Sequence, residues 1–407
     1  MSGRLFHWFE QRLELDRAGA SSNLRPMEGL RGIAVFLVFL VHCMTFTMPW
    51  WEPFTSLTAI ADLLHSMGNV GVDLFFVLSG FLIYGAVISK PQPFKTFIGR
   101  RARRIYPAFT AVFVVYLLLS WLSPAQSKIP AEPVAAALYI AENYLLLPGL
   151  FPIEPMIAVA WSLSYEFFYY LMVPLLTGVF SLRGCSRARR AGLFLGLALA
   201  LGLAFATFGG PVRLLMFIAG ILLFEALPTR LCRGLGSGAG AMALALSLAV
   251  AMAPAPGPRL QALKFAVLGA LFFVLCLSAF RRRESRLARV LSWTPLRWLG
   301  NMSYSYYLIH GLALQVAVKV LAHVLPAPAH SVWLFFALPP VFFTVSLIPS
   351  LGLFLLVERP FSLAPAAQRT GPAPALAPAS APASISTLSA NSVLPGLVAD
   401  AKENSTS

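Results

Sequence analysis

Charged residues are scarce in this sequence of 407 residues, and acidic residues are scarcer than basic ones. Only 12% of the residues are charged, with 16 Asp and Glu against 31 Lys and Arg, whereas 58% are hydrophobic and the mean hydropathy is +0.75. Such a composition excludes an ordinary soluble domain and is typical of a polytopic membrane protein. The formal charge of +15 lies in short clusters between apolar runs. We therefore expect basic loops on one side of a membrane and no nucleic-acid partner.

Cysteine is also rare, and its spacing does not suggest metal binding. Cys43 and Cys276 lie in apolar runs, Cys185 and Cys232 lie in basic loops, and no CxxC pair occurs. The sequence therefore predicts neither a disulfide nor a metal site. A P-loop, a GxSxG nucleophile motif and the apolar core of a cleavable signal peptide are absent as well. We expect no permanently bound cofactor and no cleaved signal peptide.

Long apolar runs dominate what the sequence does contain, and each is close to the length that crosses about 30 Å of hydrocarbon. The runs fall at residues 32–49, 67–89, 105–123, 157–180, 191–208, 212–228, 237–254, 262–280, 301–323 and 332–357. Ten crossings place both termini on one side, and that side collects 26 of the 31 Lys and Arg residues. By the positive-inside rule this side is cytoplasmic. The sequence thus predicts an all-α, polytopic bundle of about ten transmembrane helices with both termini cytoplasmic.

Three regions follow from this pattern. Residues 1–24 are expected to form a cytoplasmic segment, in which residues 5–15 place apolar side chains on one face, as in a short interfacial helix. Residues 25–361 form the membrane domain. Residues 362–407 are rich in Ala, Pro and Ser and predict a disordered cytoplasmic tail. The outer loop 124–156 holds six prolines and an apolar segment too short to span, and it either covers a site or caps the bundle.

The first span carries an arginine and a histidine on one helical face. Eleven steps of 100° bring His42 to within about 20° of Arg31 and about 16 Å further along the axis. Arg31 then lies at the inner membrane edge and His42 near the bilayer centre. An ionisable residue at that depth indicates a functional site, and the alternative is a histidine that packs against a neighbouring helix through a hydrogen bond.

Two further spans carry carboxylates. Asp73 lies in the second span with Ser79, and it is either functional or the structural partner of an arginine. In the fourth span, which begins with Trp161, Glu166 lies about 13 Å below the outer membrane edge and is an i,i+4 neighbour of Ser162. A carboxylate at that depth needs a partner or a task. A proton-sharing or histidine-orienting role and a structural role both fit.

The ninth span carries a polar stripe. Ser303, Tyr306, Tyr307 and His310 fall at i, i+3, i+4 and i+7, which places them on one side of a helix. His310 lies about 14 Å from the inner edge, which matches the depths of the first-span histidine and the fourth-span carboxylate. Packing alone does not readily explain such agreement, so the pattern favours a buried reaction or transport centre.

A cluster of four arginines precedes the third span: Arg100, Arg101, Arg103 and Arg104. Guanidinium groups at this position can anchor a helix to anionic lipid. They can also bind phosphate, because the fork of an arginine matches phosphate oxygens in a bidentate manner. Composition by itself leaves both interpretations open.

Taken together, these motifs resemble the acyltransferase-3 family of integral membrane acyltransferases. They occur in the order typical of the family and extend from residue 25 to residue 361. The matching segments are LRGIAVFLVFLVH at 30–42, GVDLFFVLSGFLI at 71–83, FIGRRARRIYPAF at 97–109, WSLSYEFFYYL at 161–171, SYSYYLIH at 303–310 and VERPF at 357–361.

The resemblance implies a bacterial enzyme of the inner (plasma) membrane. Its donor would be acyl-CoA, most often acetyl-CoA, used as a co-substrate on the cytoplasmic side. Its acceptor would be a hydroxyl group of an extracytoplasmic or lipid-linked carbohydrate such as lipopolysaccharide, exopolysaccharide or glucan. Arg31 and the four clustered arginines would hold the phosphates of coenzyme A through charge-assisted hydrogen bonds.

The resemblance also implies roles for the buried polar residues. His42 would act as general base on the acceptor hydroxyl, or would take the acyl group covalently. Glu166 would orient His42 or stabilise its imidazolium, and Asp73 and His310 complete the catalytic candidates. The candidates on the substrate side, including donors to the thioester oxyanion, are Ser79, Trp161 and Tyr307.

Two other classes of protein fit part of the pattern. The membrane-bound O-acyltransferase superfamily also places a histidine in the membrane, but it lacks the arginine–histidine spacing and the arginine cluster seen here. A proton-coupled transporter would use the four buried titratable residues as a proton relay. Transporters often contain inverted repeats, and no such pairing of motifs relates the two halves of this chain.

Overall fold

The computed structural model describes residues 2–15, 21–51, 54–229, 236, 238–282, 284–325 and 332–363. The chain divides into two units, Met1–Ala364 and Pro365–Ser407. All of the described residues belong to the first unit. The second unit, and with it nearly all of the predicted tail, lies outside the described residues.

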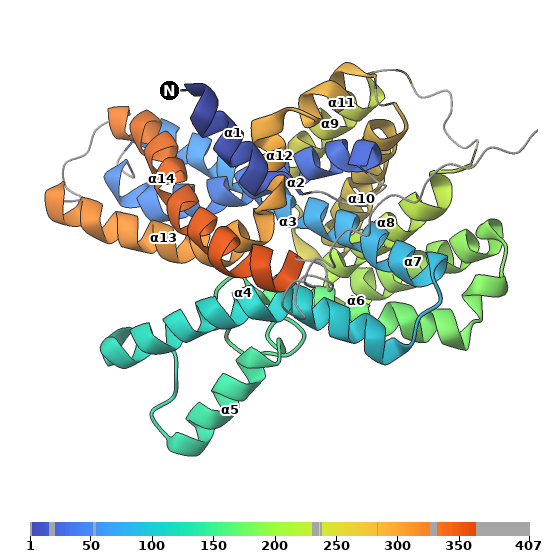
Figure 1. The fold of residues 1–407 in the computed structure, drawn as a ribbon, viewed down its shortest axis with the longest axis horizontal. Coiled ribbons are helices and arrows are strands. Elements are labelled where there is room, and N and C mark those ends of the chain that lie inside the picture. Colours follow the sequence, from blue (N-terminus) through green and yellow to red (C-terminus); the bar gives the residue numbers. More distant parts are fainter. Residues whose placement is uncertain are drawn as a thin grey trace, which may run out of the picture. The chain divides into compact units, whose positions relative to one another are not determined.

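The described residues are almost entirely helical, so the predicted all-α class is confirmed for them (Figure 1). The first half contains α1 (Ser2–Leu13), α2 (Ser21–Thr47), α3 (Thr55–Ser89), α4 (Phe94–Leu122), α5 (Pro133–Tyr144), α6 (Ala160–Val179) and α7 (Arg187–Phe208). The second half contains α8 (Leu215–Ala226), α9 (Ala239–Met252), α10 (Gly257–Arg281), α11 (Arg286–Leu291), α12 (Thr294–Asn301), α13 (Ser303–Val324) and α14 (Val332–Leu353), followed by the π-helix η5 (Phe354–Leu363).

Seven helical segments of the described chain are long and apolar enough to cross a membrane. They are Arg25–Trp50, Thr55–Ser89, Phe94–Leu122, Arg187–Phe208, Gly257–Arg281, Ser303–Val324 and Val332–Leu363. The other three predicted runs form α6, α8 and α9. Helix α6 has 20 residues but begins with a polar sequence, whereas α8 and α9 have only 12 and 14 residues. The number of about ten crossings and the cytoplasmic placement of both termini therefore remain predictions.

Helices α2 and α3 run antiparallel, because Gly68 packs against Leu37 and Gly71 against Ala34. Two further contacts mark the two ends of the bundle. At one end, Arg183 donates a 2.9 Å hydrogen bond to the carbonyl of Val87 at the end of α3. At the other end, Trp50 donates a 3.0 Å hydrogen bond to the carbonyl of Leu325 after α13. We call the first of these the basic end, because it carries Arg31, Arg101, Arg104, Arg183, Arg190, Arg281 and Arg297.

Helices α3 and α8 approach to backbone contact at the centre of the bundle. A Cβ atom added to Gly80 would lie 2.1 Å from the carbonyl oxygen of Phe217, and one added to Gly220 would lie 2.0 Å from that of Val77. Only glycine fits at such a crossing. The contact explains why the short helix α8 is buried along most of its length, and it places α3 at the centre, between α2, α6 and α8.

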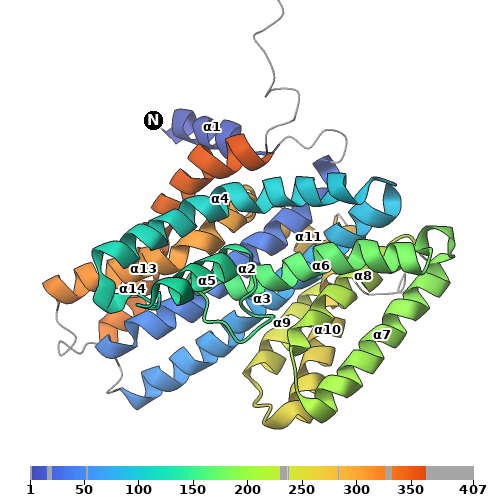
Figure 2. The same cartoon turned by 90° about the horizontal axis from the view of Figure 1, so that it is seen from below.

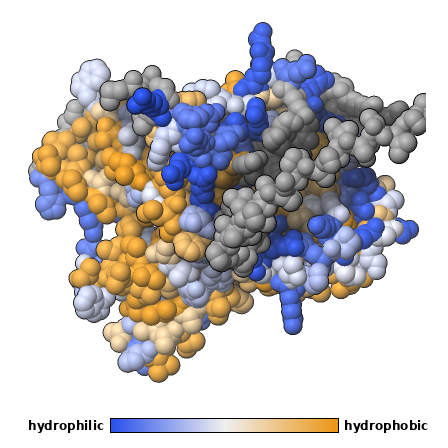
Figure 3. All heavy atoms as spheres, viewed as in Figure 1, coloured by the Kyte–Doolittle hydropathy of each residue, from blue (hydrophilic) through white to orange (hydrophobic). Residues whose placement is uncertain are grey.

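Apolar side chains gather on the outer surface over α13, α14 and the neighbouring parts of α4 and α5 (Figure 3). Large exposed residues there include Leu118, Trp121, Leu138, Val316, Val320, Trp333 and Phe336. An exposed apolar surface of this extent on so hydrophobic a chain is what contact with lipid requires. The protein is therefore an integral membrane protein.

Helix α1 lies beside the last turns of the described chain (Figure 2). Arg359 donates a 2.9 Å hydrogen bond to the carbonyl of Gln11, and Glu14 after α1 pairs with Arg297 of α12. Arg297 also donates to Glu28 at 2.9 Å. The N-terminal segment thus packs on the basic end.

Candidate active site

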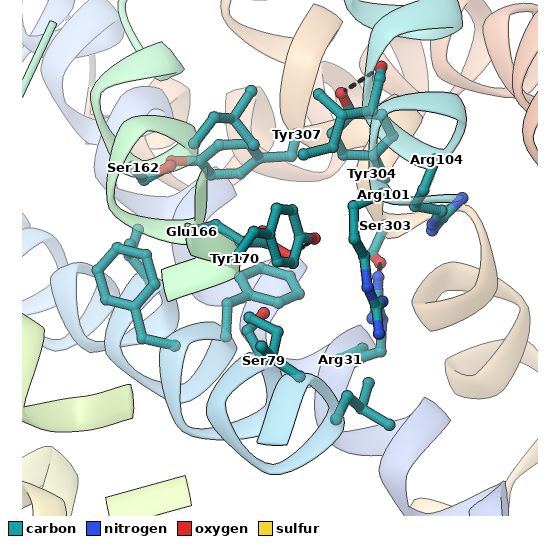
Figure 4. A pocket seen from close by; sticks show the side chains of 17 residues that line it. Arg31, Ser79, Arg101, Arg104, Ser162, Glu166, Tyr170, Ser303, Tyr304 and Tyr307 are labelled. Carbon is teal, nitrogen blue, oxygen red and sulfur yellow. Dashed lines mark hydrogen bonds between the residues drawn. The ribbon is translucent and has the colours of Figure 1, made fainter. Parts of the chain in front are cut away.

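A cavity of about 130 Å³ lies between α2, α3, α4, α6 and α13, towards the basic end. Its wall joins positive charge with hydroxyl groups and one carboxylate, and Figure 4 shows these side chains turned towards one another. The polar lining residues are Arg31, Ser79, Arg101, Arg104, Ser162, Glu166, Tyr170, Ser303, Tyr304 and Tyr307.

Arg31 is fixed against the start of α13. Its Nη2 and Nε donate to the hydroxyl of Ser303 at 2.8 and 3.1 Å, and Nε also lies 3.3 Å from the carbonyl of Gly300. The guanidinium carbon lies 5.9 Å from the centre of the Phe75 ring. These contacts hold a cation at one wall of the cavity in a single orientation.

Arg104 reaches the cavity from α4 and is held by a carboxylate that the sequence analysis did not single out. Its Nη1 lies 2.5 Å from Oε1 of Glu358, which is fully buried. The other carboxylate oxygen accepts hydrogen bonds from the backbone N–H and the hydroxyl of Ser305, at 3.0 and 2.5 Å. Glu358 belongs to the VERPF segment, and an acid directly after a long apolar run in so acid-poor a chain was the available signal.

The arginine cluster divides by helical face. Arg101 lies beside Arg104 on the cavity side, with its guanidinium 5.1 and 5.4 Å from the ring centres of Phe97 and Tyr170. Arg100 and Arg103 are exposed and do not line the cavity. Residues i and i+3 share a face, so 101 and 104 turn inward together.

Glu166 occupies the cavity wall opposite Arg31 (Figure 4). It is half-buried and accepts a 2.5 Å hydrogen bond from the hydroxyl of Tyr170, one helical turn further along α6. Among the contacts of the described residues, Glu166 has none with either predicted histidine. Its geometry therefore supports a role within the cavity.

Tyr307 and Ser162 form a pair of hydroxyls across the cavity. Their oxygen atoms lie 2.7 Å apart, and both lie within hydrogen-bond distance of the carbonyl oxygen of Val159, at 3.2 and 3.0 Å. Because each hydroxyl has one proton, one donates to this carbonyl while the other donates either to the same carbonyl or to its partner hydroxyl. One of these hydroxyls can donate to an oxyanion when a substrate is present. Val159, the residue before α6, thus anchors both hydroxyls through its carbonyl.

The two predicted histidines lie side by side behind this pair. The rings of His42 and His310 have centres 5.0 Å apart. His310 is fully buried, and its Nδ1 lies 3.0 and 2.9 Å from the carbonyls of Tyr306 and Tyr307. Because carbonyls only accept, Nδ1 carries the proton, and Nε2 is an acceptor with no hydrogen-bond partner among the described residues. The ring of Tyr307 lies 6.1 Å from that of His310, between the histidines and the cavity.

Asp73 and Trp161 lie apart from this cavity. Asp73 is fully buried, with Oδ1 3.4 Å from Nη1 of Arg213, and neither carboxylate oxygen has a hydrogen bond within the described part of the chain. The same guanidinium lies 5.6 Å from the ring centre of Trp161. The described residues contain no cluster of three His, Cys, Asp or Glu side chains that could hold a metal ion.

A helical integral membrane protein with an arginine-lined cavity beside a pair of histidines, one of them fully buried, has the attributes of a membrane-embedded enzyme. A family model described as an acyltransferase domain matches residues 26–359. The chain therefore belongs to the acyltransferase-3 family, as its motifs predicted, and carries the acyltransferase domain of that family. No solved structure matches the chain.

Several curated relatives share part of the sequence. The chain is 25% identical to peptidoglycan O-acetyltransferase OatA of Listeria monocytogenes over 333 residues, which cover 72% of this chain and 50% of that protein. It is 30% identical to the exopolysaccharide production protein ExoZ of Rhizobium meliloti over 277 residues, 65% of this chain and 82% of ExoZ. The chain thus spans about half the length of OatA and most of ExoZ.

Proposed function

We propose that the protein transfers an acetyl group from acetyl-CoA, bound at the basic end, to a hydroxyl group of a carbohydrate at the opposite end. The basic end would face the cytoplasm of a bacterium and the opposite end the outside of its inner membrane, as the distribution of basic residues predicts. The names of OatA and ExoZ support a polysaccharide acceptor and acetyl as the acyl group.

The observation that carries this proposal is the meeting of three guanidinium groups from two helices in one cavity. Arg31, Arg101 and Arg104 line the same wall region although α2 and α4 are far apart in the chain. Arginine forks bind phosphate oxygens in pairs, and coenzyme A presents several phosphates at one end of a long arm. The acyl end of that arm would extend along α2 from Arg31 towards His42.

The reaction needs a base, an oxyanion donor and a leaving group. His42, beside His310, would remove the proton from the acceptor hydroxyl, whose oxygen attacks the thioester carbonyl. A new C–O bond forms, the C–S bond breaks, and the leaving thiolate takes the proton from the imidazolium. Tyr307 or Ser162 would donate to the oxyanion, and Glu166, held by Tyr170, would supply negative charge that offsets the imidazolium.

Release of CoA from acetyl-CoA by the purified protein in lipid nanodiscs tests the proposal. We expect His42→Ala to lower acceptor-dependent CoA release by about 10²–10⁴-fold, the usual contribution of a general base. Arg31→Ala should raise KM for acetyl-CoA. His323→Ala is the matched control, because this histidine is exposed near the end of α13 and should be silent.

Undiminished acetyl transfer by His42→Ala would remove the histidine from the mechanism. Proton-coupled uptake of a solute into proteoliposomes without turnover of acetyl-CoA would instead favour the transporter.

A further inference from the structure

A second cleft opens at the end of the bundle opposite the basic end, between α3, α6, α10 and the chain that leads into α8. Its volume is about 700 Å³. Aromatic rings, two cations and one amide line it: Trp161, Tyr165, Arg213, Gln261, Lys264 and Phe265. A concave surface with a few convergent polar groups and aromatic walls is the usual form of a binding site.

The lining of this cleft is cationic. Arg213 lies between the rings of Trp161 and Phe265, 5.6 and 5.3 Å from their centres, which fixes its plane. Lys264 donates to the carbonyls of Ala251 and Ala253 at 2.7 and 2.8 Å. An ammonium group has three N–H donors, so one remains for a ligand.

No acidic residue is among the described residues that line the cleft. The nearest compensating charge is Asp73, which is fully buried beneath Arg213. Two cations against one buried carboxylate leave the cleft with a net positive charge. An anionic ligand is therefore favoured over a neutral one.

The phenyl ring of Phe76 connects the wall of the arginine-lined cavity to residues that line this cleft. Phe76 lines the cavity, and its ring centre lies 6.1 Å from that of Trp161 and 5.9 Å from that of Tyr165, both of which line the cleft. The other neighbour of Phe76 is Phe217, stacked at 4.6 Å. Lining residues of the two hollows are thus in contact through Phe76.

Two adjacent stripes of side chains on α6 line the cleft and the cavity, respectively. Trp161 and Tyr165 are i,i+4 neighbours that face the cleft, and Ser162 and Glu166 are i,i+4 neighbours that face the cavity. A molecule stacked on Trp161 would therefore lie beside the next residue, Ser162, whose hydroxyl belongs to the proposed reaction centre.

We propose that this cleft binds the acceptor, and that the acceptor is a carbohydrate with an anionic substituent, a carboxylate or a phosphate, which Arg213 and Lys264 recognise. A sugar ring would stack on Trp161 and hydrogen-bond to Gln261, while a neighbouring hydroxyl passes Phe76 to reach the thioester. The proposal rests on the acetyl transfer proposed above, and it adds the location and charge of the acceptor.

Binding of defined oligosaccharides to the full-length protein in nanodiscs tests this proposal. The probes are a hexamer of galacturonic acid, a maltohexaose that carries phosphate and an unmodified maltohexaose, each titrated by calorimetry. We expect at least one acidic hexamer to bind about tenfold or more tightly than the neutral one, since hydrogen bonds to charged groups are the stronger ones. Which acidic hexamer binds separates a carboxylate from a phosphate.

Variants of Lys264 identify the cleft as the site. Lys264→Gln should weaken binding of the acidic hexamer about tenfold, and Lys264→Arg should restore it by returning the charge. Arg259→Gln is the matched control, because Arg259 is an exposed cation on the same helix that does not line the cleft. The thermal midpoint of each variant shows whether loss of the Lys264 contacts to the α9–α10 turn has loosened the fold.

Each outcome decides between defined alternatives. Equal binding of acidic and neutral hexamers, no binding of any hexamer, or equal effects of Lys264→Gln and Arg259→Gln overturns the acceptor site. Acetyl-CoA turnover on the same preparations separates the two proposals. Turnover without selective binding leaves acetyl transfer standing and removes this site, whereas selective binding without turnover leaves a site for an anionic carbohydrate and removes acetyl transfer to it.

Discussion

Replacing Gly300 by alanine tests the helix crossing that positions Arg31. Gly300 of α12 faces α2, and a Cβ atom added to it would lie 1.8 Å from the carbonyl oxygen of Glu28 and 3.0 Å from the backbone nitrogen of Gly32. Both neighbours are backbone atoms, so no side chain can turn aside. The carbonyl of Gly300 also accepts from Arg31, whose hydroxyl partner Ser303 follows three residues later.

The size of the clash sets the expected cost. Non-bonded heavy atoms pack at about 3.5–4.0 Å, so α2 and α12 must separate by about 2 Å to admit the methyl group. Overpacking of a well-packed core costs about 1–3 kcal/mol, and a clash with backbone on both sides points to the upper end, about 3 kcal/mol. The 2.8 Å bond from Arg31 to Ser303 would lengthen with the same movement.

Thermal unfolding in detergent and acetyl-CoA kinetics provide the assay. We expect Gly300→Ala to lower the unfolding midpoint by several degrees and to raise KM for acetyl-CoA. Gly196 of α7 is the matched control, since nothing lies within 4 Å of a Cβ atom added there. Gly196→Ala should stabilise the protein by about 0.5–1 kcal/mol, because alanine favours helix over glycine. A Gly300→Ala protein as stable as wild type would refute the proposed backbone contact between α2 and α12.

Three further predictions concern carboxylates. Glu358→Gln should lower the free energy of unfolding by about 3–5 kcal/mol, the usual effect of breaking a buried ion pair. It should also raise KM for acetyl-CoA, because Arg104 loses the carboxylate that holds it. An unchanged KM would show that Arg104 does not contact the donor. Glu225→Ala should cost a similar amount without altering KM, because it removes the partner of a 2.6 Å contact with Arg190, and neither residue lines the cavity. The backbone N–H of Ala135 and that of its neighbour hold the pKa of Glu132 below its usual value. The resulting stabilisation of α5 is complete above the usual carboxylate pKa and is lost as pH falls through the lowered pKa of Glu132. Glu132→Gln should therefore raise the rate of amide hydrogen exchange in α5 at neutral pH. Equal exchange rates in the variant and the wild type would contradict this.

Helical periodicity predicted the residues of the site better than it predicted their partners. The 100° spacing places Arg31 and His42 on one face of α2, and the structure places both against α13, through Ser303 and His310 respectively. The polar stripe of residues 303–310 is the surface they meet. Because each of these helices is long and regular, residues that the sequence pattern places on one face also lie on one face in the structure.

Contacts between distant segments could not be predicted in this way. Arg104 and Glu358 are 254 residues apart, and no periodic pattern relates α4 to η5. The assignment of all four clustered arginines to one role overlooked that Arg100 and Arg103 face away from Arg101. Helical periodicity could have separated the inward-facing from the outward-facing arginines. Which helix packs against α4, by contrast, depends on tertiary packing that a single sequence does not reveal.

Apolar length did not predict the length of each helix. The run at 212–228 begins with a short 3₁₀ turn and leaves only 12 residues for α8, and the run at 237–254 forms a helix of 14 residues. Buried helices within a bundle need not match the bilayer thickness, because other helices cover them.

The central claim is that the inward-facing arginines of α4 hold the phosphates of the donor. Titration of the purified protein with CoA, for Arg101→Gln against Arg100→Gln, tests this claim most directly. These residues are adjacent in sequence and equal in charge, but only Arg101 lines the cavity. Loss of a charge-assisted hydrogen bond costs about 1.5–3 kcal/mol, so Arg101→Gln should weaken CoA binding by about ten- to a hundredfold, with Arg100→Gln close to wild type. Equal Kd values for the two variants, or undiminished binding by Arg101→Gln, would contradict the account.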